Sequence, residues 1–265
     1  MGEFAPVTEM ESVGVTNPDG AGPCVLVCEH ASKIVPSQYG DLGLDGPALD
    51  SHIAYDIGAQ AVARGMAALL DAPLVWSQVS RLIVDCNRDA DAHDLIPLKG
   101  EDRPIPGNSD LTADERQQRL DRYYHPFHTT LDRVLTARAD VGLDTALVTV
   151  HSFTPVFMGV RRHLDLGVLH DADTRLADAL LAVATQADEL VTQRNEPYAP
   201  KDGVTHTLLR HGLARGLPNV MLEIRNTLID TPDGQAKMAA RLGGYVRSAL
   251  DLDAAGLDPH ARKVG

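Results

Sequence analysis

The sequence predicts a single α/β domain with three layers, α/β/α, in which helices cover both faces of a largely parallel or mixed sheet. Short β-rich runs alternate along the chain with stretches of helical periodicity, and this alternation is typical of α/β folds. The β-rich runs are almost continuously apolar, which indicates strands that are buried on both faces. The 265 residues, 44% of them hydrophobic and 23% charged, suffice for one large domain with a substantial core.

Six runs are predicted to be strands, because each is short and rich in β-branched and aliphatic residues. They are Val25–Cys28, Pro73–Trp76, Leu82–Cys86, Ala146–Val150, Leu164–Leu169 and Asn219–Ile224. Helical periodicity lies between them and predicts four helices. These cover 51–70, 112–138, 173–187 and 232–250, with Ser51, Thr112 and Asp173 as the expected N-caps of the first three.

The two ends of the chain lack such patterns. Residues 1–22 and 253–265 are polar or punctuated by glycine and proline, so we expect flexible tails on either side of one domain at 23–252. Residues 89–108 form another irregular stretch, with three prolines and two glycines between a predicted strand and a predicted helix. Long loops of this kind are uncommon in compact domains and often serve as lids or binding loops.

The charge balance excludes several classes of partner. With 24 Lys and Arg against 37 Asp and Glu, the net charge of −13 repels nucleic acid and anionic membranes. No apolar run reaches the length of a membrane helix, and the first residues show neither the basic nor the apolar part of an export signal. We therefore expect a cytoplasmic protein with no nucleic-acid or membrane partner.

The three cysteines are an odd, low count that fits a reducing compartment better than a disulfide framework. Cys24 and Cys28 lie about 13 Å apart along one predicted strand, too far for a bridge or a shared metal. We expect Cys24, Cys28 and Cys86 to be buried apolar residues.

Polar side chains follow or end four of the predicted strands. They are Glu29-His30, Asn87-Arg88, His151-Ser152 and the pair Glu223 and Arg225. Ligands in α/β sheets collect beyond the carboxyl ends of strands. Each pair alone is a weak signal, but together they supply metal ligands, a general base and carboxylate binders.

His30 and His151 are the best candidate metal ligands. Two imidazoles and one carboxylate form the usual ligand set of a catalytic zinc site with one open position. Glu29 supplies that carboxylate only if the chain has already left the strand, because neighbours in a strand point to opposite faces. Asp56, on the helix expected from Ser51, is the competing choice, and His52 four residues before it is a further ligand or outer partner.

Glu223 is the candidate general base. It lies two residues from Arg225 and so shares a strand face with it. A carboxylate beside a guanidinium stays ionised, and the guanidinium can hold a substrate anion or a developing oxyanion; the alternative is a structural ion pair. His206, which follows a glycine-containing turn, could also reach the site, whereas His125 and His128 are expected to be structural. Motifs typical of nucleotide binding and of serine hydrolases are absent from the sequence.

At these residues the sequence resembles the N-formylglutamate amidohydrolase family. The matching segments are VCEHAS (27–32), SHIAYDIGA (51–59), SRLIVDCNR (80–88), IPGN (105–108), VTVHSFTPVFMG (148–159), NEPYAPKDGVTHTL (195–208) and GLPNVMLEIRNTLI (216–229). They extend over most of the chain. The resemblance implies a phosphorylase/hydrolase-like α/β fold.

The order of the motifs also resembles that of zinc carboxypeptidases and aspartoacylases. This likeness implies that His30 and His151 bind the metal, that Asn87-Arg88 bind the substrate and that Glu223 is the general base. Those relatives take two ligands from His-x-x-Glu, whereas here Lys33 stands three residues after His30. Zinc-dependent peptidoglycan amidases, which are similar in order, take the carboxylate from the following helix, which favours Asp56.

The implied activity is hydrolysis of an N-acyl amino acid, typified by N-formyl-L-glutamate going to formate and L-glutamate in histidine degradation. The implied cofactor is one Zn²⁺ per chain, or another divalent metal, and the implied partner is a small anionic substrate. Its carboxylates would be bound by a basic set made of Arg81, Asn87, Arg88, Arg162, His206 and Arg225. The alternatives are a zinc amidohydrolase for another N-acyl amino acid or related amide, and a non-catalytic homologue that binds carboxylates.

Overall fold

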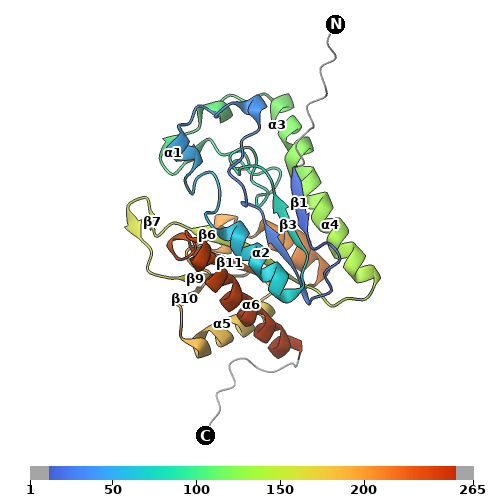
Figure 1. The fold of residues 1–265 in the computed structure, drawn as a ribbon. Coiled ribbons are helices and arrows are strands. Elements are labelled where there is room, and N and C mark those ends of the chain that lie inside the picture. The colour runs from blue at the N-terminus through green and yellow to red at the C-terminus, as the bar shows by residue number, and fades with distance from the viewer. Residues whose placement is uncertain (1–11, 255–265) are drawn as a thin grey trace.

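The computed structural model describes residues 12–254 and contains a mixed seven-stranded sheet (Figure 1). Its strands, in spatial order, are β1 (Val13–Thr16), β3 (Leu74–Ser77), β2 (Cys24–Cys28), β6 (Ala146–Phe153), β11 (Asn219–Arg225), β9 (Leu166–Leu169) and β10 (Thr192–Arg194). The four from β3 to β11 are mutually parallel. Strands β1 and β9 run antiparallel to their inner neighbours, and β10 is parallel to β9. The predicted mixed, largely parallel sheet is confirmed.

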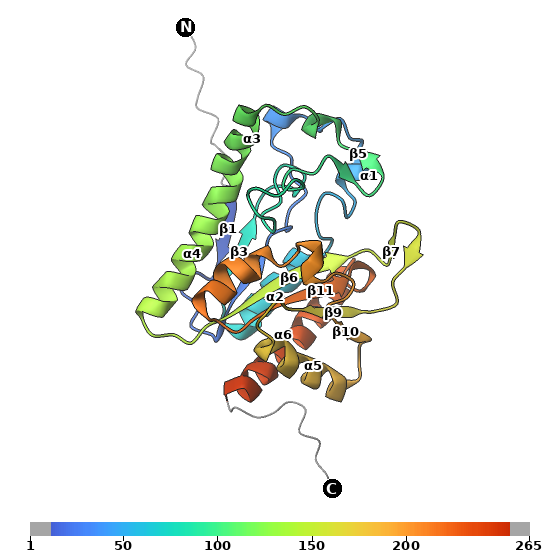
Figure 2. The same cartoon turned by 180° about the vertical axis from the view of Figure 1, so that it is seen from behind.

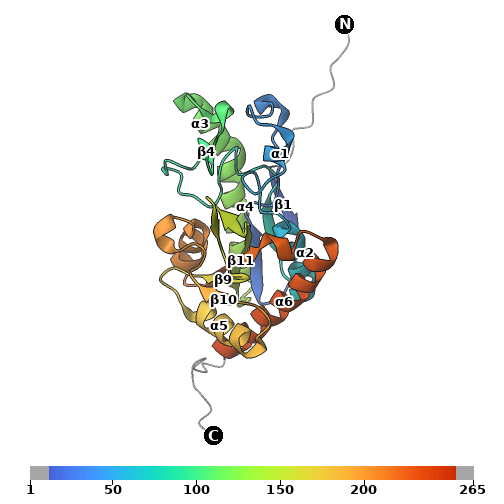
Figure 3. The ribbon, with the colours of Figure 1, turned by 90° about the vertical axis from the view of Figure 1, so that its left-hand side faces the viewer.

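Helices cover both faces of this sheet, as predicted. Helices α2 (Ala59–Leu70), α5 (Arg175–Ala187) and α6 (Pro232–Ala254) pack on one face, and α4 (His125–Asp140) packs on the other (Figures 1 to 3). Alternate residues of β2 show the division: Cys24, Leu26 and Cys28 belong to the core beneath the first group. Val25 and Val27 belong to the core beneath α4. A central strand that is apolar on both faces therefore explains the three layers.

Short elements complete the described chain. Helix α1 spans Gly46–Leu49 and α3 spans Ala113–Arg119, and two small hairpins pair β4 (Lys99–Gly100) with β5 (Arg103–Pro104) and β7 (Val156–Phe157) with β8 (Val160–Arg161). Single turns of 3-10 or π helix are η1 (Ser37–Tyr39), η2 (Pro106–Asn108), η3 (Leu120–Tyr124), η4 (Pro200–Asp202), η5 (Leu208–Gly212), η6 (Leu213–Arg215) and η7 (Asn226–Leu228). Within 12–254, no helix combines the length and hydropathy that crossing a membrane requires.

The predicted cap at Thr112 is confirmed. Its hydroxyl accepts a hydrogen bond from the Glu115 amide at 3.2 Å, and the Glu115 carboxylate accepts one from the Thr112 amide at 2.8 Å. This reciprocal capping box fixes the start of α3. The three cysteines are buried and unpaired, as expected.

The strand predicted at Leu82–Cys86 is wrong. The segment is buried but forms successive turns, in which the Ile83 amide donates to the Ser80 carbonyl and the Arg88 amide to the Asp85 carbonyl. Because an apolar run signals burial and not backbone geometry, a buried loop produces the same pattern as a buried strand.

Two helix starts also differ from the prediction. Helix α2 begins at Ala59 after Gly58, so Ser51 is not its cap and Asp56 lies in the preceding loop. Helix α5 begins at Arg175 with Thr174 at the N-cap position, one residue after the predicted Asp173.

The predicted N-terminal tail extended too far along the chain. Strand β1 lies inside 1–22 and pairs with β3, where Gly14 packs directly against the Trp76 ring. Residues 1–11 lie outside the described residues, as does the predicted C-terminal tail beyond Ala254, where α6 ends.

Candidate active site

Residues from all four polar pairs, including Asn87 and Arg88, line one cavity of about 550 Å³. His151 on β6 and Glu223 on β11 are direct partners in the register of two parallel strands, so their side chains leave the same face of the sheet. His30 follows β2, the other neighbour of β6. The predicted meeting of these residues at the carboxyl edge of the sheet is therefore observed.

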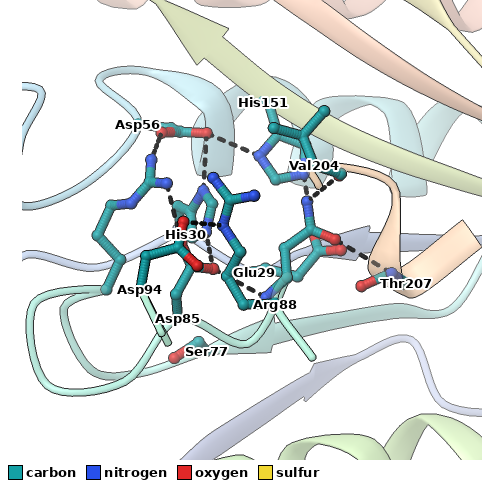
Figure 4. Close-up of polar contacts among 12 residues, drawn as sticks. Glu29, His30, Asp56, Ser77, Asp85, Arg88, Asp94, His151, Val204 and Thr207 are labelled. Atoms are coloured by element: carbon teal, nitrogen blue, oxygen red, sulfur yellow. Dashed lines mark hydrogen bonds and ion pairs between the residues drawn. The ribbon is translucent and has the colours of Figure 1, made fainter. Parts of the chain in front are cut away.

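A buried group of His30, Asp56 and His151 lines this cavity, and Figure 4 shows the polar contacts among the three side chains. One potential ligand atom from each residue lies within 4.8 Å of the others. The Asp56 Oδ2 atom is 3.4 Å from His30 Nδ1 and 2.9 Å from His151 Nδ1. Two imidazoles and one carboxylate, turned toward a common point, are a ligand set suited to a zinc ion with an open position.

Each histidine also contacts a second carboxylate through its other ring nitrogen. His30 Nε2 lies 2.6 Å from Asp85 Oδ1, and His151 Nε2 lies 3.1 Å from Glu29 Oε2 (Figure 4). Carboxylates in such positions orient imidazole rings for metal binding. The Nδ1 atom of His30 is buried and forms no hydrogen bond with the described residues, which fits a ligand atom.

The charges around the histidines favour their protonated forms. Although burial opposes a charged imidazole, Glu29 and Asp56 raise the pKa of His151 well above its usual value. Burial alone would raise the pKa of Asp56, but His30 and His151 hold it far below its usual range. Because a metal ligand must be unprotonated at its binding nitrogen, metal binding would compete with protonation of these histidines.

The geometry separates the two candidate carboxylates. Asp56 faces both Nδ1 atoms, and its backbone amide donates to the His30 carbonyl at 2.9 Å, which ties the loop before α2 to the end of β2. Glu29 lies on the far side of His151 and is not one of the residues that form the cavity wall. His52 lines the cavity but pairs with Glu101 at 3.4 Å, so the structure does not bring it into the group.

Glu223 is buried beside this group and lines the cavity. Burial, together with the charge of Asp56, raises its pKa to about 7. Its Oε2 atom forms no hydrogen bond with the described residues. A buried carboxylate with an uncommitted oxygen and a pKa near neutrality has the properties of a general base.

The predicted pairing of Glu223 with Arg225 is wrong. Arg225 forms an ion pair with Asp165, and its amide donates to the Asp165 carbonyl at 2.9 Å. It is not among the residues of the cavity wall. The two residues do share a strand face, but the segment just before the neighbouring β9 offers Arg225 a closer carboxylate.

Three arginines of the predicted basic set line the cavity: Arg81, Arg88 and Arg162. Arg81 donates to Asp85 at 2.9 Å and lies 3.4 Å from Asp56. Arg88 pairs with Asp94 at 3.3 Å, whereas Arg162 donates to the Tyr198 hydroxyl at 3.1 Å.

Asn87 also lines the cavity, but it ties two chain segments together. Its amide nitrogen donates to the Val204 carbonyl at 2.6 Å, and its oxygen accepts from the Thr207 amide at 3.1 Å. His206 does not form part of the described cavity wall, and its Nε2 atom lies 2.9 Å from the Tyr124 hydroxyl. These two residues hold the 204–207 segment in place.

Asp85 and Tyr198 also line the cavity but were not predicted to belong to the site. Asp85 lies inside the segment that was predicted to be a strand. A lone carboxylate within this apolar run was the only sign in the sequence that Asp85 could belong to a site. Tyr198 lies in the matched segment NEPYAP, outside the four polar pairs near the predicted strand ends. The 89–108 stretch does contribute to the wall, through Asp94, Pro97 and 99–101, as a binding loop would.

Comparisons with known proteins agree with this geometry. The family model for N-formylglutamate amidohydrolase matches residues 22–229. The crystal structure of a gene product of Agrobacterium tumefaciens is 47% identical, with a TM-score of 0.90, over 91% of this chain and 96% of that one. None of the curated proteins matches the chain.

A second solved structure shares the fold. It is the N-formylglutamate amidohydrolase of Ralstonia eutropha, 18% identical with a TM-score of 0.74, over 94% of this chain and all of that one. The family model covers far more than half of the sequence, including every residue of the buried group and Glu223. The chain belongs to the N-formylglutamate amidohydrolase family, whose members are hydrolases that act on an amide bond.

Proposed function

We propose that this chain is a zinc-dependent amidohydrolase that cleaves an N-acyl amino acid, with N-formyl-L-glutamate as its most favoured substrate. The observation that carries the proposal is the placement of the buried group of His30, Asp56 and His151 beside Glu223 in one cavity. Membership of the family supports amide hydrolysis. The products would be formate and L-glutamate, a step of histidine degradation.

The residues present fit a divalent metal ion. His30, Asp56 and His151 would hold it, while Asp85 and Glu29 orient the two imidazoles. When bound, zinc supplies a Lewis acid that polarises the substrate carbonyl and makes a water molecule more acidic.

Glu223 would take the proton from the attacking water and deliver it to the leaving amine. Its raised pKa suits both steps, because a group with a pKa near the working pH is about half ionised, so the carboxylate can accept a proton and its conjugate acid still donates readily. Its uncommitted Oε2 atom leaves room for the proton.

The wall of the cavity would bind the anionic part of the substrate. Arg81, Arg88 and Arg162 face it, and guanidinium groups match carboxylates in a two-pronged geometry. A local basic wall reconciles an acidic protein of net charge −13 with an anionic substrate. Arg225 and His206, which lie outside the wall, would act on the substrate only through other residues.

We also propose a cytoplasmic location, which the three buried, unpaired cysteines support. The first alternative function is an amidohydrolase for another N-acyl amino acid or related amide. The second is a non-catalytic homologue that binds carboxylates, and the presence of both the buried group and Glu223 argues against it.

Formate release from a panel of N-formyl amino acids, with the N-acetyl compounds alongside, tests the proposal. We expect zinc-loaded protein to release formate from N-formyl-L-glutamate faster than from any other member. Faster turnover of a different N-acyl amino acid would support the first alternative. Binding of L-glutamate without turnover of any compound would support the second.

A further inference from the structure

Among the described residues, Arg162 differs from the other two cavity arginines in having no carboxylate partner. Arg81 is neutralised by Asp85 and Asp56, and Arg88 by Asp94. Within the part of the chain that the structure describes, the one hydrogen bond of the Arg162 side chain is donated to the neutral Tyr198 hydroxyl. A guanidinium in a cavity wall without a counter-ion attracts an anion from solution.

Aromatic rings hold this guanidinium in place. The carbon at its centre lies 4.6 Å from the centroid of the Phe157 ring, 4.7 Å from that of Tyr198 and 5.8 Å from that of Phe153. Such contacts fix the plane of the guanidinium and leave its charge uncompensated, because an aromatic face carries no net charge. The N–H groups along its edge that do not contact Tyr198 stay available to a ligand.

The Tyr198 hydroxyl has a proton to donate. Because Arg162 Nη1 donates to the Tyr198 oxygen, the hydroxyl proton must point elsewhere, and no described residue accepts it in a hydrogen bond. Tyr198 lines the same cavity as Glu223. Burial, with the charge of Glu223, raises the pKa of Tyr198, so the hydroxyl remains a proton donor.

We propose that Arg162 and Tyr198 together bind a carboxylate of the substrate and determine the preference for anionic N-acyl amino acids. The inference rests on the proposed function for the identity of the substrate. It assigns a different role to Arg88, whose charge Asp94 already balances and whose Nη1 atom donates to the Asp202 carbonyl. Arg88 shapes the wall of the cavity, and Arg162 binds the anion.

Direct binding of glutarate, a dicarboxylate without an amide bond, tests the inference without turnover. Isothermal titration calorimetry on the metal-loaded protein compares wild type with Arg162→Gln and Tyr198→Phe. Arg161→Gln is the matched control, since Arg161 is the exposed neighbour on β8. Thermal unfolding of each variant reports whether it is folded.

We expect glutarate affinity to fall about 10- to 100-fold in Arg162→Gln, the range for losing a hydrogen bond to a charged group. Tyr198→Phe, which keeps the ring that contacts Arg162, is expected to lose about 10-fold. Arg161→Gln should match wild type. Equal affinity of a folded Arg162→Gln and Arg161→Gln would overturn the inference.

A kinetic experiment identifies the carboxylate. Wild type and Arg162→Gln are compared on N-formyl-L-glutamate and on its two amides. N-formyl-L-glutamine lacks the side-chain carboxylate, and N-formyl-L-isoglutamine lacks the α-carboxylate. The inference predicts that the effect of Arg162→Gln on kcat/KM largely disappears for one of the two amides. An effect of the same size on all three would show that Arg162 contacts neither carboxylate.

The two proposals fail in different ways. If wild type releases formate from none of these compounds, the proposed function is wrong, and the glutarate titration still decides whether Arg162 and Tyr198 bind a carboxylate. If wild type turns over N-formyl-L-glutamate and Arg162→Gln does so equally well, the function stands and the inference is wrong.

Discussion

Replacing Asp85 with asparagine should weaken metal binding although Asp85 is not itself a proposed ligand. Its Oδ1 atom lies 2.6 Å from His30 Nε2, and its Oδ2 atom accepts from Arg81 at 2.9 Å. The Asn87 amide also donates to Oδ1, at 2.8 Å, so the carboxamide of Asp85→Asn has one acceptor oxygen for three donors, and His30 or Arg81 loses its partner. Losing a hydrogen bond of this charge-assisted kind costs about 1.5 to 3 kcal/mol. At 1.36 kcal/mol per factor of ten, this corresponds to about 10- to 100-fold in metal affinity, the range known for such outer partners.

Competition between the protein and a chelator of known zinc affinity measures this effect. Asp94→Asn is the matched control, because Asp94 lines the same cavity and pairs with Arg88 but touches no proposed ligand. We expect the control to bind zinc as wild type does. Equal zinc affinity of Asp85→Asn and Asp94→Asn would refute the argument that Asp85 orients His30.

Glu223→Gln keeps the shape of the side chain and removes its basicity, so turnover, measured as formate release, should fall about 10²- to 10⁴-fold. The metal content, measured by elemental analysis, should not change. Near-normal turnover would assign the base to another residue. The pKa of the buried His211, which lies 2.8 Å from His128 and 3.0 Å from Asp132, is lowered to about 4 by burial, so the folded state binds fewer protons than the unfolded chain between about pH 4 and pH 6.5. The contribution of this group to the free energy of unfolding should be complete above about pH 6.5 and should fall by about 3 kcal/mol as the pH decreases to 4. Denaturant unfolding at several pH values should therefore show that the free energy of unfolding depends less steeply on pH in His211→Gln than in wild type. An equal pH dependence in the two proteins would contradict this assignment.

Much of the fold could be predicted because its signals are local. The alternation of apolar runs with helical periodicity predicted the central strands, and the Thr112 capping box marks a helix start through two hydrogen bonds between near neighbours. The error at Leu82–Cys86 has a physical reason. Burial depends on what packs around a segment, and Leu82 and Cys86 are buried by residues far away in sequence.

The candidate site was predictable in part for a similar reason. His30, His151 and Glu223 follow from their places near the ends of parallel strands, since the sheet itself brings those ends together. The choice between Glu29 and Asp56 depends on how the loop before α2 folds back over β2, through the bond from the Asp56 amide to the His30 carbonyl. Partners that are distant in sequence, such as Asp165 for Arg225, leave no local pattern to read.

The central claim is that His30, Asp56 and His151 hold a catalytic metal ion, and the zinc content of purified variants tests it most directly. Elemental analysis would compare wild type with Asp56→Ala and with Glu29→Gln, since the structure places one carboxylate between the two Nδ1 atoms and the other behind His151. The account predicts one zinc ion per chain in wild type, loss of most of it in Asp56→Ala, and a smaller loss of zinc in Glu29→Gln. Full zinc content in a folded Asp56→Ala would contradict it.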